Sequence, residues 1–303
     1  MIRLMILLPR LHHNFSRHLR PVLILAVCFV TLFFLAGCSM IMSSATSDMM
    51  THLSATISNN DDLDLVENGA PAYLLMIDSL ISKDPNNEKM LYTAANLYSS
   101  YADLFVKDDL RSKKMADKAL KYANKALCLS KKEACDLKSN SYEDFQSIIS
   151  KIQKNQVPAL FAMGNAWARW IMVNKNDFNA IADLSRIELI MKRVIELDES
   201  YQDGAAYLYL GTLSSLLPPA LGGKPENGKT FFEKALIISQ GKNLMVKVMY
   251  AKFYARLMFD RTLHDRLLKE VSQADPYVPG YTLINTWAKK QANILSLSAD
   301  EYF

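Results

Sequence analysis

Residues Gly222–Thr230 read GGKPENGKT and contain a match to G-x-x-x-x-G-K-[ST], the pattern of a phosphate-binding loop. In such a loop the backbone amides surround the phosphates, Lys229 would reach the terminal phosphates and Thr230 would bind magnesium. That geometry requires a buried strand before the glycines. Here the preceding residues have a helical pattern interrupted by two prolines, and Pro225 removes one of the amides. The sequence therefore predicts no nucleotide site and no cofactor.

Motifs of catalysis and of metal binding are otherwise missing from the sequence. It has no G-x-S-x-G or H-E-x-x-H motif, and no cysteine placed as a nucleophile beside a histidine. We interpret Asp260 as a helix N-cap and expect His264 on the surface of the first turn. Beyond residue 38 the histidines are His52 and His264, and neither has a second soft ligand nearby. The sequence predicts a protein that is not an enzyme and holds no metal.

The segment LPPALGGKPEN is better explained as an extended loop between two helices. Its glycines turn the chain, and Pro225 is suited to the first position of the next helix. Three prolines stiffen a connection that is longer than a helical hairpin needs, so it could fold over a concave face of the domain. The loop therefore supplies candidate ligand-channel residues, namely Pro218, Pro219, Leu221, Gly222 and Gly223.

Residues 157–173, VPALFAMGNAWARWIMV, are apolar around almost the whole circumference of the predicted helix. Such a helix must be buried or line an apolar cavity. Trp167 and Trp170 share a face with two other apolar side chains, and only Asn165 and Arg169 are strongly polar. Core packing and the wall of an apolar channel, with Asn165 or Arg169 as its polar handle, both remain open. The channel candidates on this helix are Leu160, Met163, Asn165, Trp167, Arg169 and Trp170.

From about Leu63 onward the apolar residues recur with helical spacing, and alternating runs rich in Val, Ile and Thr are missing. A degenerate repeat ends in acidic turns after Asp84 and Asp275. Gly211 and Gly228 occupy the small-residue positions at which paired helices approach each other. The sequence thus predicts an all-α fold, a tetratricopeptide-like solenoid of helical hairpins with divergent repeats.

The N-terminal residues have the organisation of a bacterial lipoprotein signal. Arginines precede an apolar run over Pro21–Ala36, which is short for a spanning helix, and the run ends in the lipobox-like sequence LAGC. In this interpretation Cys38 becomes the lipidated first residue; the alternative is an ordinary signal anchor with an incidental cysteine. Ser39 favours the periplasmic face of the outer membrane over the inner one.

Three segments follow from this interpretation. We expect a lipoprotein signal peptide over 1–37, a lipidated N-terminus and tether over 38–62, and a helical-repeat domain over 63–303. Removing the four arginines of 1–37 from the 35 basic residues leaves as many basic as acidic residues, 31 each. The exported chain is then neutral, and nothing in its charge points to a nucleic acid.

Two cysteines, Cys128 and Cys135, remain after Cys28 and Cys38 are assigned to the signal. They lie seven residues apart across a polar break. Outside the cytoplasm this spacing favours a local disulfide, with two free thiols as the alternative.

Similarity to a known family is carried by four segments: WARWIMVNKNDFNAIADL, LPPALGGKPENGKTFFEKAL, YAKFYARLMFDRTLHDRLL and LINTWAKKQANILSLSADEYF. Together they resemble the T-component lipoproteins of TRAP transporters, from about residue 65 to the end and most densely after 158. The resemblance implies a periplasmic, lipid-anchored, all-helical repeat protein that partners the solute-binding subunit of a tripartite ATP-independent transporter. It also implies a channel suited to an apolar ligand and a homo-oligomer, with a trimer as the candidate form.

Two classes of function follow. The first is an accessory binding and scaffolding lipoprotein, attached to the membrane by its lipid, for transport of a small hydrophobic carboxylate. The second is a tetratricopeptide-type adaptor lipoprotein for outer-membrane or cell-wall assembly. An adaptor would share the lipobox and the hairpins, but it would not need the stiff Pro/Gly loop or the apolar helix.

Overall fold

In this computed structural model the residues that can be described are 52–303, and every regular element among them is a helix. The predicted all-α class is therefore confirmed for this part of the chain. Residues 52–58 are helical, and the helices that follow, in chain order, are α2 (Leu63–Lys83), α3 (Glu88–Phe105), α4 (Asp109–Ser130), α5 (Tyr142–Ser150), α6 (Val157–Val173), α7 (Phe178–Ala182), α8 (Leu184–Asp198), α9 (Ala205–Ser214), α10 (Pro225–Ile238), α11 (Met245–Met249), the π-helix η5 (Tyr250–Ala255), α12 (Arg261–Gln273), α13 (Thr282–Leu297) and α14 (Ala299–Tyr302). Four short 3-10 turns join them: η1 (Lys132–Ala134), η2 (Lys154–Gln156), η3 (Tyr201–Gly204) and η4 (Pro219–Leu221).

Polar side chains fix where several helices begin. Asp62, Asn87 and Asp260 each accept a hydrogen bond from the backbone amide three residues later, at 2.9, 3.0 and 2.8 Å. Each satisfies one of the amides that a helix start leaves without a partner. The predicted role of Asp260 as an N-cap is confirmed, and α2, α3 and α12 start at defined residues.

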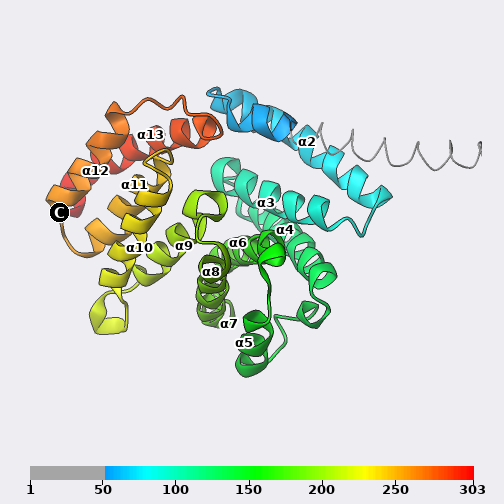
Figure 1. Ribbon diagram of the computed structural model, residues 1–303. Helices are drawn as coiled ribbons and strands as arrows, with labels where there is room; N and C mark the ends of the chain where they lie inside the picture. The colour runs from blue at the N-terminus through cyan, green and yellow to red at the C-terminus, as the bar shows by residue number, and fades with distance from the viewer. Residues whose placement is uncertain (1–51) are drawn as a thin grey trace, which may run out of the picture. The chain divides into compact units, whose positions relative to one another are not determined.

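Helix α6 lies at the centre of the packing. Figure 1 shows α3, α4 and α8 grouped around it, and α6 contacts all three. Leu160, Met163 and Trp167 of this helix have no exposed surface at all. An unbroken apolar helix is stable in water only when its neighbours cover it, and here they do.

Glycines bring α9 and α10 into close contact. A Cβ atom on Gly211 would lie 2.9 Å from the ring of Phe232, and one on Gly228 would lie 2.1 Å from the hydroxyl of Ser215. Both distances are shorter than a carbon contact allows, so these positions require glycine. The two small-residue positions predicted from the sequence therefore lie where paired helices touch.

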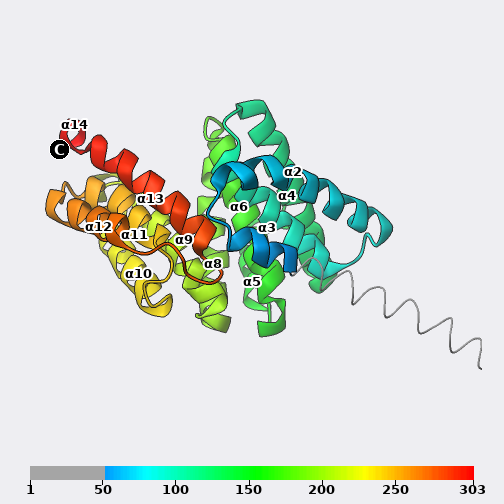
Figure 2. The same ribbon diagram turned by 90° about the horizontal axis from the view of Figure 1, so that it is seen from above.

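The beginning and the end of the unit Ile57–Phe303 are joined. The hydroxyl of Tyr277 donates to Asp61 at 2.8 Å, and the amide of Gly280 donates to the side chain of Asn59 at 2.6 Å. Figures 1 and 2 show α13 beside the first turns of α2, and these two helices are in contact. The succession of helices in this unit thus returns to its start.

His264 contradicts its predicted position on the surface. Its side chain has no exposed area, Nε2 accepts from Nε of Arg256 at 3.3 Å, and Nδ1 lies 2.9 Å from Asp265. The ring of Phe303 packs against the imidazole with the centroids 5.1 Å apart. The prediction was wrong because residues after α13 return over the first turn of α12 and cover it.

The signal peptide predicted over 1–37, the lipidation of Cys38 and most of the 38–62 tether lie outside the described residues. Within 52–303, none of the helices combines the length and the apolar character needed to cross a bilayer.

Candidate functional site

One face of α6 is packed as core. Trp167 is fully buried, its ring meets Phe145 edge-on at 6.1 Å, and its indole nitrogen donates to Asp183 at 3.2 Å. Trp170 is only partly buried. Its indole nitrogen donates to Asp117 at 2.9 Å, and the ammonium of Lys138 lies 3.3 Å from its ring centroid. The two tryptophans therefore contact α4, α5, α8 and the segment that follows the disulfide.

A different face of α6 carries Phe161, Asn165 and Arg169, which are four residues apart and therefore aligned along the helix. Asn165 connects three helices. Its amide nitrogen donates to Oδ1 of Asn96 on α3 at 2.8 Å, and its oxygen accepts from the hydroxyl of Tyr209 on α9 at 2.6 Å. A buried amide needs such partners, and these two tie α3, α6 and α9 together.

Arg169 forms an ion pair with Asp103 of α3, with 2.6 Å between Nη1 and Oδ1. Its other terminal nitrogen donates to the carbonyl of Ala102 at 3.2 Å and to the hydroxyl of Ser112. The guanidinium is enclosed, with 14% of its side chain exposed, whereas the side chain of Asp103 is 48% exposed. The carboxylate is thus the accessible member of the pair.

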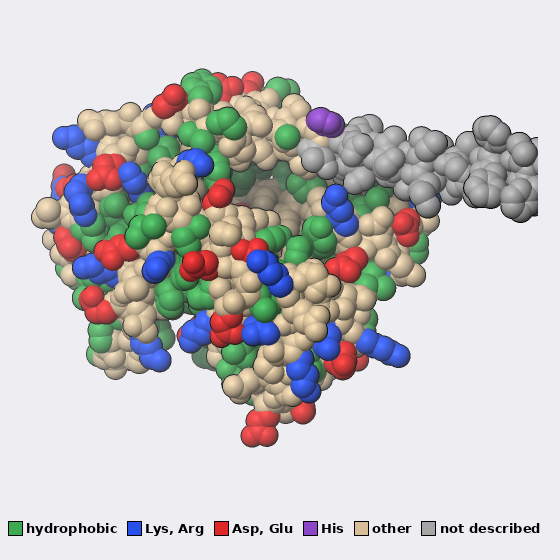
Figure 3. Space-filling view, viewed as in Figure 1, with side chains coloured by type: hydrophobic (Ala, Val, Ile, Leu, Met, Phe, Trp, Pro, Cys, Tyr) green, Lys and Arg blue, Asp and Glu red, His purple; other side chains and the backbone are tan. Residues whose placement is uncertain are grey.

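Asp103 is open to water on one side and desolvated by the protein on the other. Although its side chain is half exposed, burial raises its pKa above the ordinary value of 3.8, and the nearby charge of Arg169 opposes that rise. Burial also raises the pKa of Tyr209, and the nearby charge of Asp103 raises it further. Figure 3 shows one face of the molecule hollowed between the helices that Figure 1 labels α3 and α13, and Asp103 belongs to α3.

Aromatic rings border these polar groups. Phe161 contacts Tyr201 and Tyr209, with ring centroids 5.4 and 5.9 Å apart. Phe105 of α3 contacts Trp287 of α13 at 5.9 Å. Burial raises the pKa of Tyr201 to about 12, as expected for a phenol held away from water. The rings are apolar and the polar atoms are few, and two of these atoms, Nε of Arg169 and the hydroxyl of Ser99, are buried without a hydrogen-bond partner.

We call Asn96, Asp103, Asn165, Arg169 and Tyr209 the inner polar cluster. The sequence alone singled out Asn165 and Arg169, and the structure brings both into the cluster. Sequence reasoning missed the other three. A signal for two of them is present in α3, where Asn96 and Asp103 lie seven residues apart on one face, with Ser99 between them.

The predicted Pro/Gly loop follows the C-terminal end of α9 and is held by hydrogen bonds within its own backbone. The amide of Gly223 donates to the carbonyl of Pro218 at 3.1 Å, and that of Gly222 donates to Pro219 at 3.0 Å. A Cβ on Gly223 would lie 1.7 Å from the carbonyl oxygen of Leu217, so the turn requires glycine there. Leu221 is 67% exposed, and Figure 1 shows the connection between α9 and α10 at the lower left, apart from α3.

No strand precedes the glycines of this loop within the described residues, and α10 begins at Pro225, as the sequence predicts. A phosphate loop needs that strand. Among residues 52–303 there is also no group of three or more His, Cys, Asp or Glu side chains arranged to hold a metal ion.

The family model described as the TRAP transporter T-component matches residues 59–303. The matched region contains every helix from α2 to α14 and the whole inner polar cluster. The chain belongs to the TRAP transporter T-component family. The resemblance found in the sequence is thereby confirmed.

This T-component is also similar to an uncharacterized protein of Treponema pallidum (strain Nichols). The two are 23% identical over 270 residues, which covers 81% of this chain and 82% of the relative. The similarity extends over most of both chains.

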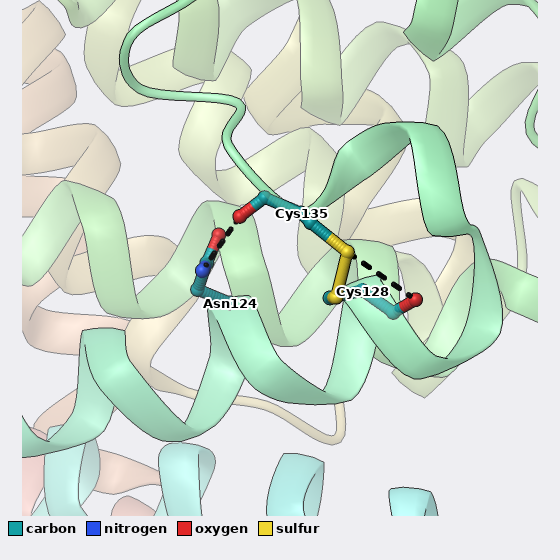
Figure 4. Close-up of a disulfide and its surroundings, with 3 residues drawn as sticks. All are labelled: Asn124, Cys128 and Cys135. Atoms are coloured by element: carbon teal, nitrogen blue, oxygen red, sulfur yellow. Dashed lines mark hydrogen bonds between the residues drawn. A yellow bond between two sulfur atoms is a disulfide. The ribbon is translucent and has the colours of Figure 1, made fainter.

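The T-component also contains a disulfide between Cys128 and Cys135, whose Cα atoms are 4.2 Å apart (Figure 4). The side-chain amide of Asn124 donates to the carbonyl of Cys135 at 3.0 Å. The segment that follows is held by Arg186 of α8, which donates to the carbonyls of Leu137 and Asn140 at 3.0 and 2.7 Å. The disulfide therefore closes the end of α4, and the hydrogen bonds attach the next residues to α8.

Proposed function

We propose that this protein is a periplasmic, lipid-anchored accessory component of a TRAP transporter that binds the solute-binding subunit and a small apolar ligand. Membership of the T-component family supports the transport role and an association with other TRAP components. The lipobox-like sequence ending at Cys38 supports attachment to the periplasmic face of a membrane, with the outer membrane as the expected one.

The observation that carries the ligand part of the proposal is the inner polar cluster. Protein binding sites for small apolar molecules combine apolar walls with a few fixed polar groups. Here Asn165 and the Asp103–Arg169 pair supply the polar groups, and Phe161 and Tyr209 supply aromatic wall. The inner polar cluster is built from α3, α6 and α9, so a single folded unit would hold the ligand.

The arrangement of helices in the proposal is tetratricopeptide-like. Its support is the α9–α10 pair, in which Gly211 admits the ring of Phe232 and Gly228 admits the neighbouring helix. Small residues facing an aromatic ring in this way are typical of tetratricopeptide hairpins. A surface built from stacked hairpins is also suited to holding a protein partner.

The test is direct association with a solute-binding protein encoded beside this gene. We expect the purified lipid-free protein to bind that subunit in surface plasmon resonance and to shift its sedimentation coefficient. Sedimentation of the protein alone would report whether it forms a homo-oligomer, such as a trimer. Failure to bind any neighbouring solute-binding protein, together with capture of outer-membrane or cell-wall assembly proteins, would contradict the proposal and favour the adaptor function.

A further inference from the structure

The charges of the inner polar cluster cancel. Arg169 contributes one positive charge, and Asp103, with its oxygen 2.6 Å away, contributes one negative charge. The remaining members, Asn96, Asn165 and Tyr209, are uncharged side chains that hydrogen-bond to one another. A ligand that brings a net charge to this place would lose its hydration and meet no unpaired counter-charge. Its binding would therefore be penalised whichever sign it carries.

The accessible atoms of the cluster favour a hydrogen-bond donor. The terminal nitrogens of Arg169 are directed to Asp103, Ala102 and Ser112, and its Nε is buried without a hydrogen-bond partner, where a ligand does not reach it. The carboxylate of Asp103 is half exposed and can accept a further hydrogen bond. A ligand approaching the pair from solvent would therefore meet an acceptor before a donor.

We propose that the inner polar cluster selects an uncharged alcohol with an apolar body, whose hydroxyl donates to Asp103, over a free carboxylate or an amine of the same length. This inference rests on the proposed function, because it specifies the ligand of that site. It differs from the hydrophobic carboxylate expected from the sequence. The difference arises because Arg169, which alone would attract a carboxylate, already has a partner on α3.

The test compares three probes of equal length, 1-octanol, octanoate and octylamine, by calorimetric titration of the lipid-free protein at neutral pH. We expect 1-octanol to bind at least about tenfold more tightly than either charged probe, because only the alcohol satisfies Asp103 without adding charge. Equal or tighter binding of octanoate would overturn the proposal, and so would the absence of binding by all three probes.

Two substitutions should change the preference in opposite directions. Asp103→Asn leaves the charge of Arg169 unpaired, so octanoate should become the preferred probe by about tenfold. Arg169→Met leaves Asp103 unpaired and should favour octylamine. The matched control is Asp78→Asn, because Asp78 also pairs with a cation, Lys118, but between α2 and α4. It should retain the preference for 1-octanol.

If both site variants keep the order of the wild-type protein, Asp103 does not determine the ligand and the proposal fails. The comparison of probes on the wild-type protein needs no variant, so it decides the question even if a substitution impairs folding. Association with the solute-binding subunit is measured separately. A wrong ligand class would therefore leave the transport role intact.

Discussion

The carboxylate of Asp103 and the guanidinium of Arg169 are 2.6 Å apart, yet the first is half exposed and the second is enclosed. The pair therefore presents its negative end to solvent and keeps its positive end within the packing of α3, α4 and α6. Protonation of Asp103 would reverse that polarity, because the charge of Arg169 would then be uncompensated.

The first prediction concerns pH. Burial holds the pKa of Asp103 above 3.8, so on acidification this group takes up its proton earlier than an ordinary aspartate. Binding of 1-octanesulfonate, which stays anionic throughout, should be weak at neutral pH and should strengthen as the pH falls through that pKa. Calorimetric titration at a series of pH values measures it. In Asp103→Asn the sulfonate should bind at all pH values, and a parallel pH dependence in that variant would contradict the assignment.

The second prediction separates the two tryptophans of α6. Trp167 is fully buried against Phe145, so Trp167→Ala should lower the free energy of unfolding by about 3–5 kcal/mol. Trp170 is partly exposed and packs under Lys138, so Trp170→Ala should have an effect smaller by at least about 1 kcal/mol. Urea denaturation followed by circular dichroism measures both. Equal losses would mean that Trp170 is as much a part of the core as Trp167.

The third prediction concerns the disulfide. Closing so short a loop is worth about 2–3 kcal/mol on the chain-entropy estimate, so the double variant Cys128→Ala, Cys135→Ala should lose about that much. The fold should survive, because Arg186 still holds the following residues through two backbone carbonyls. Thiol labelling of the exported wild-type protein under denaturing, non-reducing conditions should find neither cysteine free. Labelling of both would show that the pair is unbonded in the cell.

The fourth prediction uses two glycines in helices. In Gly211→Ala the new methyl group would meet the buried ring of Phe232, and overpacking of this kind should lower stability by about 1–3 kcal/mol. Gly69 of α2 is the matched control, because nothing lies within 4 Å of a Cβ placed there. Gly69→Ala should raise stability by about 0.5–1 kcal/mol through helix propensity. Thermal melting of the two variants should shift in opposite directions, and a shared direction would refute the close contact of α9 and α10.

The sequence predicted the helical class because periodicity and caps act over a few residues. Asp260 at the start of α12 and Pro225 at the start of α10 show this, since each role depends on the adjacent turn alone. The burial of His264 could not be predicted in the same way. It depends on Phe303, which is 39 positions away and follows α14.

Only part of the candidate site could be predicted from the sequence, because its other residues come from distant parts of the chain. Asn165 and Arg169 stood out because they are polar residues in an apolar helix. Their partners did not, because Asn96 and Tyr209 lie 69 and 44 residues away, and a single sequence does not reveal which helices pack together. Arg169 could be recognised from the sequence as a polar group of the site, but Asp103, whose charge neutralises it, could not.

The hydrogen bond between Asp61 and Tyr277 has a consequence for the order of folding. It joins residues 216 positions apart, whereas most helix contacts in this unit join near neighbours along the chain. Local helix pairs form quickly, while closing a loop of that length is slow and entropically unfavourable. During synthesis Asn59 and Asp61, which precede α2, must therefore wait for Tyr277 and Gly280 before these two hydrogen bonds can form. A chain stalled before that point would leave the residues before α2 without these contacts and accessible to chaperones and proteases of the compartment in which it folds.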